Sequence, residues 1–298
     1  IRDSCGVKVF VGSSTGTLLV SNHEDIKKIM KSTKKMISFH SEDEDELIKR
    51  ERFRKKNKPQ SHYIWRDVNT ALKSTKKLIA NANKTKKKIH ILHITSAEEV
   101  KHLKKNKKYV SFEVTPQHLV FSAPSAYKKL GTYAQMNPPI RDSRHKKVLR
   151  QALKKNDIDL IGSDHAPHLK SEKKLSYPKS PSGMPGVQTL LPVLLNEVHK
   201  KTISLNYLVR LTSFNVIKIF KIKNKGLIKE GFDADLSIVD LNKKMKFSNS
   251  MVKSKCGWSP FHGTQFNGWP VGTIINGNKV FWNGKLVGKP DGKPIKFS

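Results

Sequence analysis

The sequence predicts an α/β fold in which parallel strands alternate with helices, as in part of a TIM-type (β/α)8 barrel. Two observations lead to this prediction. Short apolar runs rich in β-branched residues alternate with stretches of helical periodicity, which is typical of parallel βα units. In addition, most of these runs end in a polar residue, and the catalytic groups of a βα barrel lie at the C-terminal ends of its strands.

The predicted strands follow one another at regular intervals through the first half of the chain. They are residues 6–12, 36–40, 89–94, 110–114 and 158–162. Between the first two strands, Asn22 is expected to cap a helix over residues 23–34. A closed barrel has eight strands, so the sequence predicts strands 4–8 only and a chain that begins partway through a domain.

The C-terminal part of the sequence changes character. Strand-like residues at 234–240 and 271–275 are accompanied by Asn276-Gly277 and Asn283-Gly284, and Asn-Gly pairs favour tight β-hairpins. We therefore expect two units. They are a partial barrel with C-terminal helices, residues 1–225, and a small β-sandwich-like appendage, residues 226–298.

The net charge of the chain is +34, from 58 lysine and arginine residues against 24 aspartate and glutamate residues. Such a charge is compatible with a nucleic-acid partner. The lysines recur as separate doublets rather than one block, and neither RNA-binding aromatic motifs nor zinc-finger spacings occur. We therefore favour solvated lysine-rich faces over a nucleic-acid partner.

Two cysteines, Cys5 and Cys256, lie far apart in the sequence and exclude a disulfide framework, which fits a reducing cytoplasm. No apolar run approaches the ~18 residues that a membrane span requires. The composition thus predicts a cytoplasmic protein with no membrane partner.

Polar residues at the predicted strand ends are candidate metal ligands. His40, His93 and Asp164 come from three different strands, and equivalent positions converge at the mouth of a barrel. Neutral imidazole and carboxylate groups suit zinc and similar divalent ions. Lys8 lies inside a predicted buried strand, where an unpaired ammonium is costly. Reaction with carbon dioxide would turn Lys8 into an anionic carbamate that can bridge two metal ions, which makes it a further candidate.

Several segments resemble, in order, the motifs of the cyclic amidohydrolases. The matching segments are 6–16, 39–44, 91–99, 113–119, 136–141, 162–168, 182–187, 231–236 and 255–261. The segment Asp164-His165-Ala166-Pro167-His168 resembles dihydroorotases in its second histidine, His168. Allantoinases and hydantoinases differ from this segment at the same place. The resemblance implies an amidohydrolase-superfamily barrel that interconverts dihydroorotate plus water and N-carbamoyl-L-aspartate, in the biosynthesis of pyrimidines and UMP.

The resemblance also implies the roles of the four candidate ligands. Two zinc ions would be bridged by carboxylated Lys8, with His40 and His93 on one ion and Asp164 on the other. Hydroxide would attack the ring amide carbonyl. Asp164 would be the catalytic residue that accepts a proton from this hydroxide and delivers it to the leaving ring nitrogen.

A second set of roles concerns the substrate. By resemblance, His168 would contact the substrate carboxylate and Asn137 the pyrimidine ring, while the backbone around Ser182 and Gly183 would close over it. Dihydroorotate carries a carboxylate, so a pocket rich in hydrogen-bond donors is chemically sensible. His62 and Arg66 also resemble a family segment, and we interpret them as structural.

One family motif is absent from the sequence. The His-x-His-x-Arg segment of the family's first strand does not occur, and by resemblance it would supply two metal ligands and an anchor for the substrate carboxylate. Without these ligands, the resemblance implies that the isolated chain lacks part of the metal site that activity requires. The possible partners beyond the substrate are a second copy of the chain, in a homo-oligomer, or aspartate transcarbamoylase.

Three other functions remain open. A sister hydrolase of allantoin, hydantoins or dihydropyrimidines is disfavoured by His168. A non-catalytic dihydroorotase-like scaffold for aspartate transcarbamoylase would be expected to lose metal ligands, yet all four candidates are present. A basic nucleic-acid-binding module would require one contiguous positive face.

Overall fold

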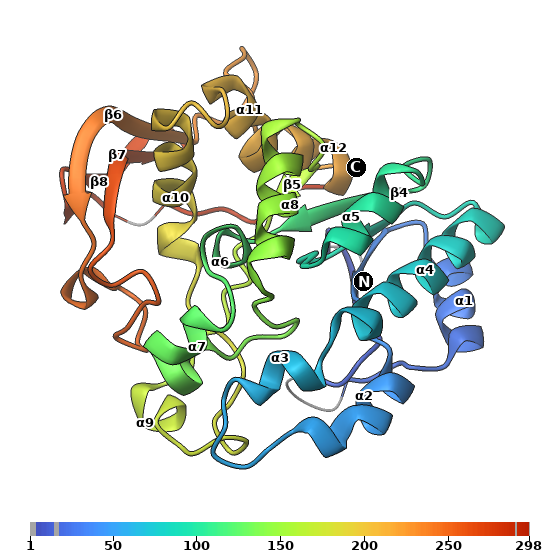
Figure 1. Ribbon diagram of the computed structural model, residues 1–298. Coiled ribbons are helices and arrows are strands. Elements are labelled where there is room, and N and C mark those ends of the chain that lie inside the picture. Colours follow the sequence, from blue (N-terminus) through green and yellow to red (C-terminus); the bar gives the residue numbers. More distant parts are fainter. Residues whose placement is uncertain (1–3, 15–17, 290, 298) are drawn as a thin grey trace.

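Five parallel strands form the central sheet of the computed structural model, which describes residues 4–14, 18–289 and 291–297 (Figure 1). Their order in the sheet is sequential, β1-β2-β3-β4-β5. The strands are β1 Gly6–Phe10, β2 Met36–His40, β3 Ile89–Ile91, β4 Val110–Val114 and β5 Leu160–Ile161. A sequential order arises when each βα unit is added to the same edge, as in the wall of a barrel. The predicted α/β class and all five predicted strands are confirmed.

The central sheet is open within the described residues. Hydrogen-bonded register runs from Phe10 opposite His40 in the first pair to Val114 opposite Ile161 in the last. The sequence predicted five of eight strands, and five are present, but closure into a barrel is not observed among the residues described.

Helices cover one face of this sheet (Figure 1). The longer ones are α1 His23–Ser32, α4 Val68–Thr85, α5 Ala97–Lys104, α8 Ser143–Lys154 and α10 Val187–His199. Phe39, Ile91 and Phe112 share one register row and pack with helical residues such as Leu78 in the main apolar core. The neighbouring row carries Ser38, His90 and Ser111, so the opposite face of the sheet is polar.

Short helices complete the first part of the fold. They are α2 Glu44–Arg50, α3 Ser61–Trp65, α6 Pro116–Val120, α7 Ser125–Leu130, α9 Lys170–Lys173, α11 Leu205–Val209 and α12 Asn215–Phe220, with single turns η1 Glu51–Phe53, η2 Gly131–Ala134 and η3 Arg210–Phe214. A further turn, η4 Asn249–Met251, belongs to the C-terminal part. The predicted cap of the first helix is confirmed, because the Asn22 side chain accepts hydrogen bonds from the backbone of Glu24 and Asp25.

An antiparallel sheet forms the C-terminal part, at the orange and red end of Figure 1. Its strands are β6 Leu236–Lys246, β7 Gln265–Ile275, β8 Asn278–Trp282 and β9 Lys285–Leu286. Asn276 and Asn283 have φ angles of 49° and 46°, and each is followed by a positive-φ glycine, which confirms both predicted hairpin turns.

The predicted sandwich-like packing of this part is wrong for the described residues. They contain one C-terminal sheet rather than two facing sheets. The sheet packs on helix α10 instead, where Val193 joins Phe247, Phe266 and Trp269 in an apolar cluster. Across the described part of the chain, no helix has both the length and the apolar character that crossing a membrane requires.

Candidate active site

His40 and His93 meet at the C-terminal ends of β2 and β3. Nδ1 of His40 lies 3.0 Å from Nε2 of His93, and the two rings pack edge to face with centroids 4.8 Å apart. Both side chains are buried. His93 adopts a positive φ of 39°, which is uncommon for a residue with a side chain and marks a locally constrained backbone. The structure therefore brings together two of the four predicted ligands.

Burial keeps both imidazoles neutral. Removal from water lowers the pKa of His40. It also lowers the pKa of His93 well below its ordinary value, and the neighbouring His40 ring lowers the pKa of His93 further. Neutral imidazoles can offer lone pairs to a metal ion. An ion bound at 2.0–2.1 Å to two tetrahedrally arranged nitrogens would hold them about 3.4 Å apart, close to the observed separation. Nδ1 of His93 is also buried without a hydrogen-bond partner among the described residues.

A buried ion pair fixes the orientation of His40. Nε2 of His40 donates to Oε2 of Glu42 at 3.0 Å, and Arg66 donates to the same oxygen at 2.6 Å. Burial alone would raise the pKa of Glu42, but Arg66 and His40 hold it well below its ordinary value. Arg66 also donates to the carbonyl oxygen of Ser13 at 2.6 Å. The carboxylate of Glu42 thus directs Nδ1 of His40 toward His93.

Lys8 is exposed, so its predicted burial is wrong. Among the described strands β1 pairs only with β2, and beyond that pairing it has an isolated bridge between Phe10 and Leu19. The Lys8 ammonium lies 4.6 Å from the centroid of the Phe10 ring. Its positive charge nevertheless acts to lower the pKa values of His40, His93 and Asp164, so Lys8 is within electrostatic reach of each of the other three candidates.

Asp164 follows β5 and also has a positive φ, 40°. Burial raises its pKa to about 6, opposed by Lys8 and reinforced by the nearby carboxylate of Glu113. Glu113 is itself held 3.1 Å from Nε2 of His90. An acid with this pKa can hold or release a proton near neutral pH.

The four predicted ligands do not form a complete coordination cluster. Within residues 4–14, 18–289 and 291–297, no three histidine, cysteine, aspartate or glutamate side chains come together as metal ligands. The chemistry of the donors nonetheless fits a divalent ion, because two neutral imidazole nitrogens face each other. The structure thus assembles the imidazole half of the predicted site.

The predicted substrate residues also lie together. Nε2 of His62 is 3.0 Å from Oδ1 of Asn137 and 3.5 Å from Oγ of Ser182. Nε2 of His168 donates to the carbonyl oxygen of Ser182 at 3.1 Å. Gly183 donates its backbone N–H to Gln135, and a Cβ at Gly183 would lie 2.5 Å from a backbone oxygen, so only glycine fits there.

Four buried residues of the site went unrecognised in the sequence or were interpreted as structural. Glu42 stands two positions after His40. His62 lies in α3, and Arg66 follows one helical turn later, directly after the helix. These two spacings were the sequence signals that could have indicated a role. Lys173 carried no sequence signal, since it belongs to a lysine-rich stretch. It is buried, and its ammonium donates to the carbonyl oxygens of Pro181, Gly183 and Gln135.

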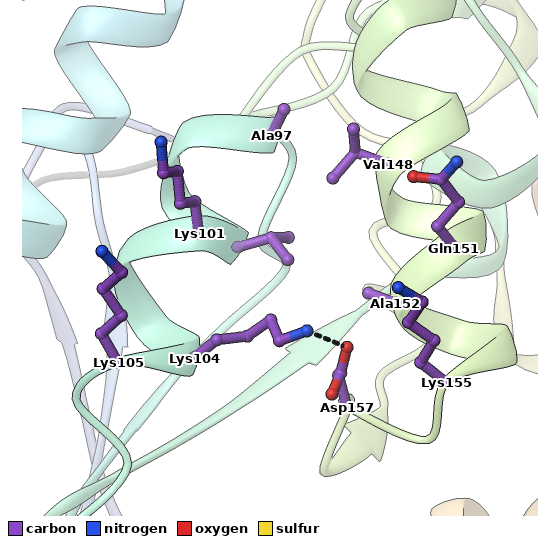
Figure 2. A pocket seen from close by; sticks show the side chains of 10 residues that line it. Ala97, Lys101, Lys104, Lys105, Val148, Gln151, Ala152, Lys155 and Asp157 are labelled. Carbon is purple, nitrogen blue, oxygen red and sulfur yellow. Dashed lines mark ion pairs between the residues drawn. The ribbon is translucent and has the colours of Figure 1, made fainter.

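A cavity of about 470 Å³ lies elsewhere, between α5 and α8 (Figure 2). Its rim carries four lysines, one of which, Lys104, pairs with Asp157 at 2.6 Å. The ten side chains that line it include neither histidine nor cysteine. The hydrolytic chemistry predicted from the sequence therefore has its residues at the strand ends and not in this cavity.

Comparison with known proteins gives matches over most of the chain. The model of the amidohydrolase family matches residues 18–280. A dihydroorotase of Pyrococcus horikoshii is 36% identical over 290 residues, which cover 97% of this chain and 63% of that protein. A dihydroorotase of Methanosarcina acetivorans is 34% identical over 301 residues, which cover 95% of this chain and 63% of that protein. The chain thus spans less than two thirds of the length of these relatives.

Solved structures are similar in fold. L-hydantoinase from Arthrobacter aurescens superposes with a TM-score of 0.90 at 24% identity, over 96% of this chain and 67% of that one. Dihydropyrimidinase from Brevibacillus agri gives a TM-score of 0.87 at 26% identity, over 95% and 65%. The first of these likenesses concerns the fold alone.

Proposed function

Because the chain belongs to the amidohydrolase family, we propose that it hydrolyses a cyclic amide, interconverting dihydroorotate and N-carbamoyl-L-aspartate in pyrimidine biosynthesis. One observation carries the proposal. His40 and His93 face each other at the ends of adjacent parallel strands, within electrostatic reach of Lys8, which also acts on Asp164. The identity to dihydroorotases over nearly the whole chain supports this substrate above other cyclic amides.

We also propose that the five parallel strands belong to the wall of a closed (β/α)8 barrel in the complete protein. Residues 1–225 would contribute to that barrel and residues 226–298 to a separate β unit. The similarity in fold to the hydantoinases supports this arrangement. A cytoplasmic location, with small molecules rather than nucleic acid as ligands, fits the two free cysteines and the scattered lysines.

His40, His93, Asp164 and a carboxylated Lys8 would hold the metal, for which zinc suits the ligand types. Bound there, zinc would lower the pKa of a bound water to ~7 and supply hydroxide. Asp164 would accept the proton released at this position and return it to the leaving ring nitrogen. A pKa of about 6 suits that task, since the carboxylate is a base at neutral pH and its acid form is accessible.

The substrate would lie between the histidine pair and the loop that carries Ser182 and Gly183. Asn137 would contact its ring and His168 its carboxylate. In the structure, Nε2 of His168 donates to the carbonyl oxygen of Ser182. Contact with a carboxylate therefore requires either the other ring nitrogen or a rearrangement of this hydrogen bond.

A hydantoinase-type substrate is the second candidate, because similar solved structures are a hydantoinase and a dihydropyrimidinase. A scaffold that binds aspartate transcarbamoylase, or assembly into a homo-oligomer, would be an additional role. These alternatives differ in what the site must recognise. Dihydroorotate has a ring carboxylate, and dihydrouracil and hydantoin do not.

The test compares ligands on the zinc-supplemented chain by calorimetry and by a hydrolysis assay. We expect dihydroorotate and carbamoyl aspartate to bind more tightly than dihydrouracil, hydantoin or allantoin. His168→Ala should weaken binding of dihydroorotate and leave the affinity for dihydrouracil unchanged. Equal or tighter binding of the uncarboxylated rings would overturn the proposed substrate, and unaltered binding in both His40→Ala and His93→Ala would overturn the proposed site.

A further inference from the structure

His62 is a buried histidine that the proposed chemistry does not use. It lies in helix α3, where its ring packs edge to face against Trp65 and Tyr177. Its Nε2 approaches two oxygen atoms from a distant part of the chain, the carbonyl of Met136 at 3.2 Å and Oδ1 of Asn137 at 3.0 Å. The ring therefore connects α3 to the segment that carries a predicted substrate contact.

The proton of His62 can be located from these contacts. A backbone carbonyl oxygen only accepts hydrogen bonds, so the bond to Met136 requires a hydrogen on Nε2. Burial, aided by the charge of Arg66, lowers the pKa of His62 to about 3, so the ring is neutral and carries one hydrogen. Nδ1 is then an acceptor, and it faces the hydroxyl of Tyr177 at 3.5 Å.

This proton position determines the orientation of the Asn137 amide. An N–H group at 3.0 Å cannot face the amide NH2, so Asn137 must turn Oδ1 toward His62. This orientation of the Asn137 amide follows without distinguishing its nitrogen from its oxygen, because the Met136 carbonyl fixes His62 as the donor. Nδ2 of Asn137 is consequently on the opposite side, where it lies 3.5 Å from Oγ of Ser14 in the loop after β1.

We propose that His62 is a positioning residue that locks Asn137 with its NH2 group directed to the substrate. The site would then select a hydrogen-bond acceptor, a carbonyl or carboxylate oxygen, at this position and disfavour a ring N–H. Ser182, whose Oγ lies 3.5 Å from the same Nε2, is placed by the same ring. The inference deepens the proposed function and rests on it for the identity of the substrate.

The first test measures the proton directly and needs no activity. In the full chain with ¹⁵N-labelled histidine, NMR gives the tautomer of each ring, and His62→Gln identifies the His62 signals among the twelve histidines. We expect the Nε2–H tautomer, unchanged through the neutral pH range. An Nδ1–H tautomer, or titration near the ordinary pKa of histidine, would overturn the proposal.

The second test separates positioning from general structure. His62→Gln keeps a donor at the end of the side chain, whereas His62→Leu removes it. We expect the glutamine variant to retain affinity for dihydroorotate and the leucine variant to lose about tenfold, which is the scale of one hydrogen bond. Asn137→Asp, which keeps the acceptor and removes the NH2 donor, should lose affinity while His62 keeps its Nε2–H tautomer.

The outcomes distinguish this proposal from the proposed function. If the chain binds no dihydroorotate, the substrate assignment fails, yet the tautomer still decides the orientation of Asn137. If His62→Leu does not fold, Asn137→Asp carries the affinity test. Equal affinity for dihydroorotate in the wild type and Asn137→Asp would overturn the role of the NH2 group.

Discussion

Oε2 of Glu42 lies 3.0 Å from Nε2 of His40, and this bond turns the other ring nitrogen of His40 toward His93. A carboxylate behind a metal-binding histidine fixes the tautomer and orientation of the ring, and loss of such a partner typically costs 10–100-fold in metal affinity. The pair is buried together with Arg66, so water cannot replace the missing contact.

Glu42→Gln is therefore expected to weaken zinc binding by about 10–100-fold, measured by competition with a chromophoric chelator. The amide keeps the size of the side chain but loses the charge that holds His40 and Arg66. Glu46→Gln, on the partly exposed surface of α2, is the matched control and should bind zinc like the wild type. Unchanged zinc affinity in folded Glu42→Gln would refute the orienting role.

Zinc should also stabilise the folded chain. A ligand that binds only the folded state at a free concentration of 100 times its Kd raises the free energy of unfolding by about 2.7 kcal/mol. We expect zinc to raise Tm in the wild type, and a chelator to reverse the rise. His93→Ala should abolish the effect, whereas His199→Ala, at an exposed position near the end of α10, should not. An equal rise in both variants would mean that zinc binds elsewhere.

Much of the fold could be predicted from the sequence because its signals are local. Alternating periodicity located the strands. A polar residue at the end of an apolar run then identified His40, His93 and Asp164 as candidates. Asn22 and the two Asn-Gly turns likewise depend on neighbouring residues only.

The features that the sequence did not predict depend on contacts between segments that are far apart in the chain. The exposure of Lys8 is decided by which strands flank β1, which a pattern within residues 6–12 does not contain. His62 reaches Asn137 across 75 residues, and Lys173 reaches Gln135 across 38. No periodicity reports such a pairing, so the partners of these two residues became known only from the folded structure.

Gly183 should tolerate no side chain. Its φ of 144° is one that residues with a side chain rarely adopt, and a Cβ would lie 2.5 Å from the carbonyl oxygen of Ala166. Gly183→Ala is expected to lower the free energy of unfolding by more than ~1 kcal/mol, measured in urea, and to weaken dihydroorotate binding. Gly263→Ala is the control, because its φ is also positive but no atom lies within 4 Å of the added Cβ. If both variants lost equal stability, backbone conformation alone would be the cause.

Lys173 should make stability depend on pH in the alkaline range. The side chain is fully buried, and burial lowers its pKa from 10.5 to about 7. Below pH 7 the folded and unfolded states both hold the proton. Between about pH 7 and 10.5 the folded state releases it while the unfolded state keeps it, so the free energy of unfolding rises with pH.

The shift sets a ceiling of about 5 kcal/mol on this rise, and the three carbonyl acceptors of the ammonium reduce it. Lys173→Met lacks the titrating group, so the stability of the wild type relative to this variant should increase from pH 7 to 10.5, measured by urea unfolding at each pH. Lys174→Met, at the exposed neighbouring position, should keep the wild-type slope. Parallel curves for the wild type and Lys173→Met would show that the ammonium retains its proton among the carbonyl oxygens of Pro181, Gly183 and Gln135, with a pKa close to that of the unfolded chain.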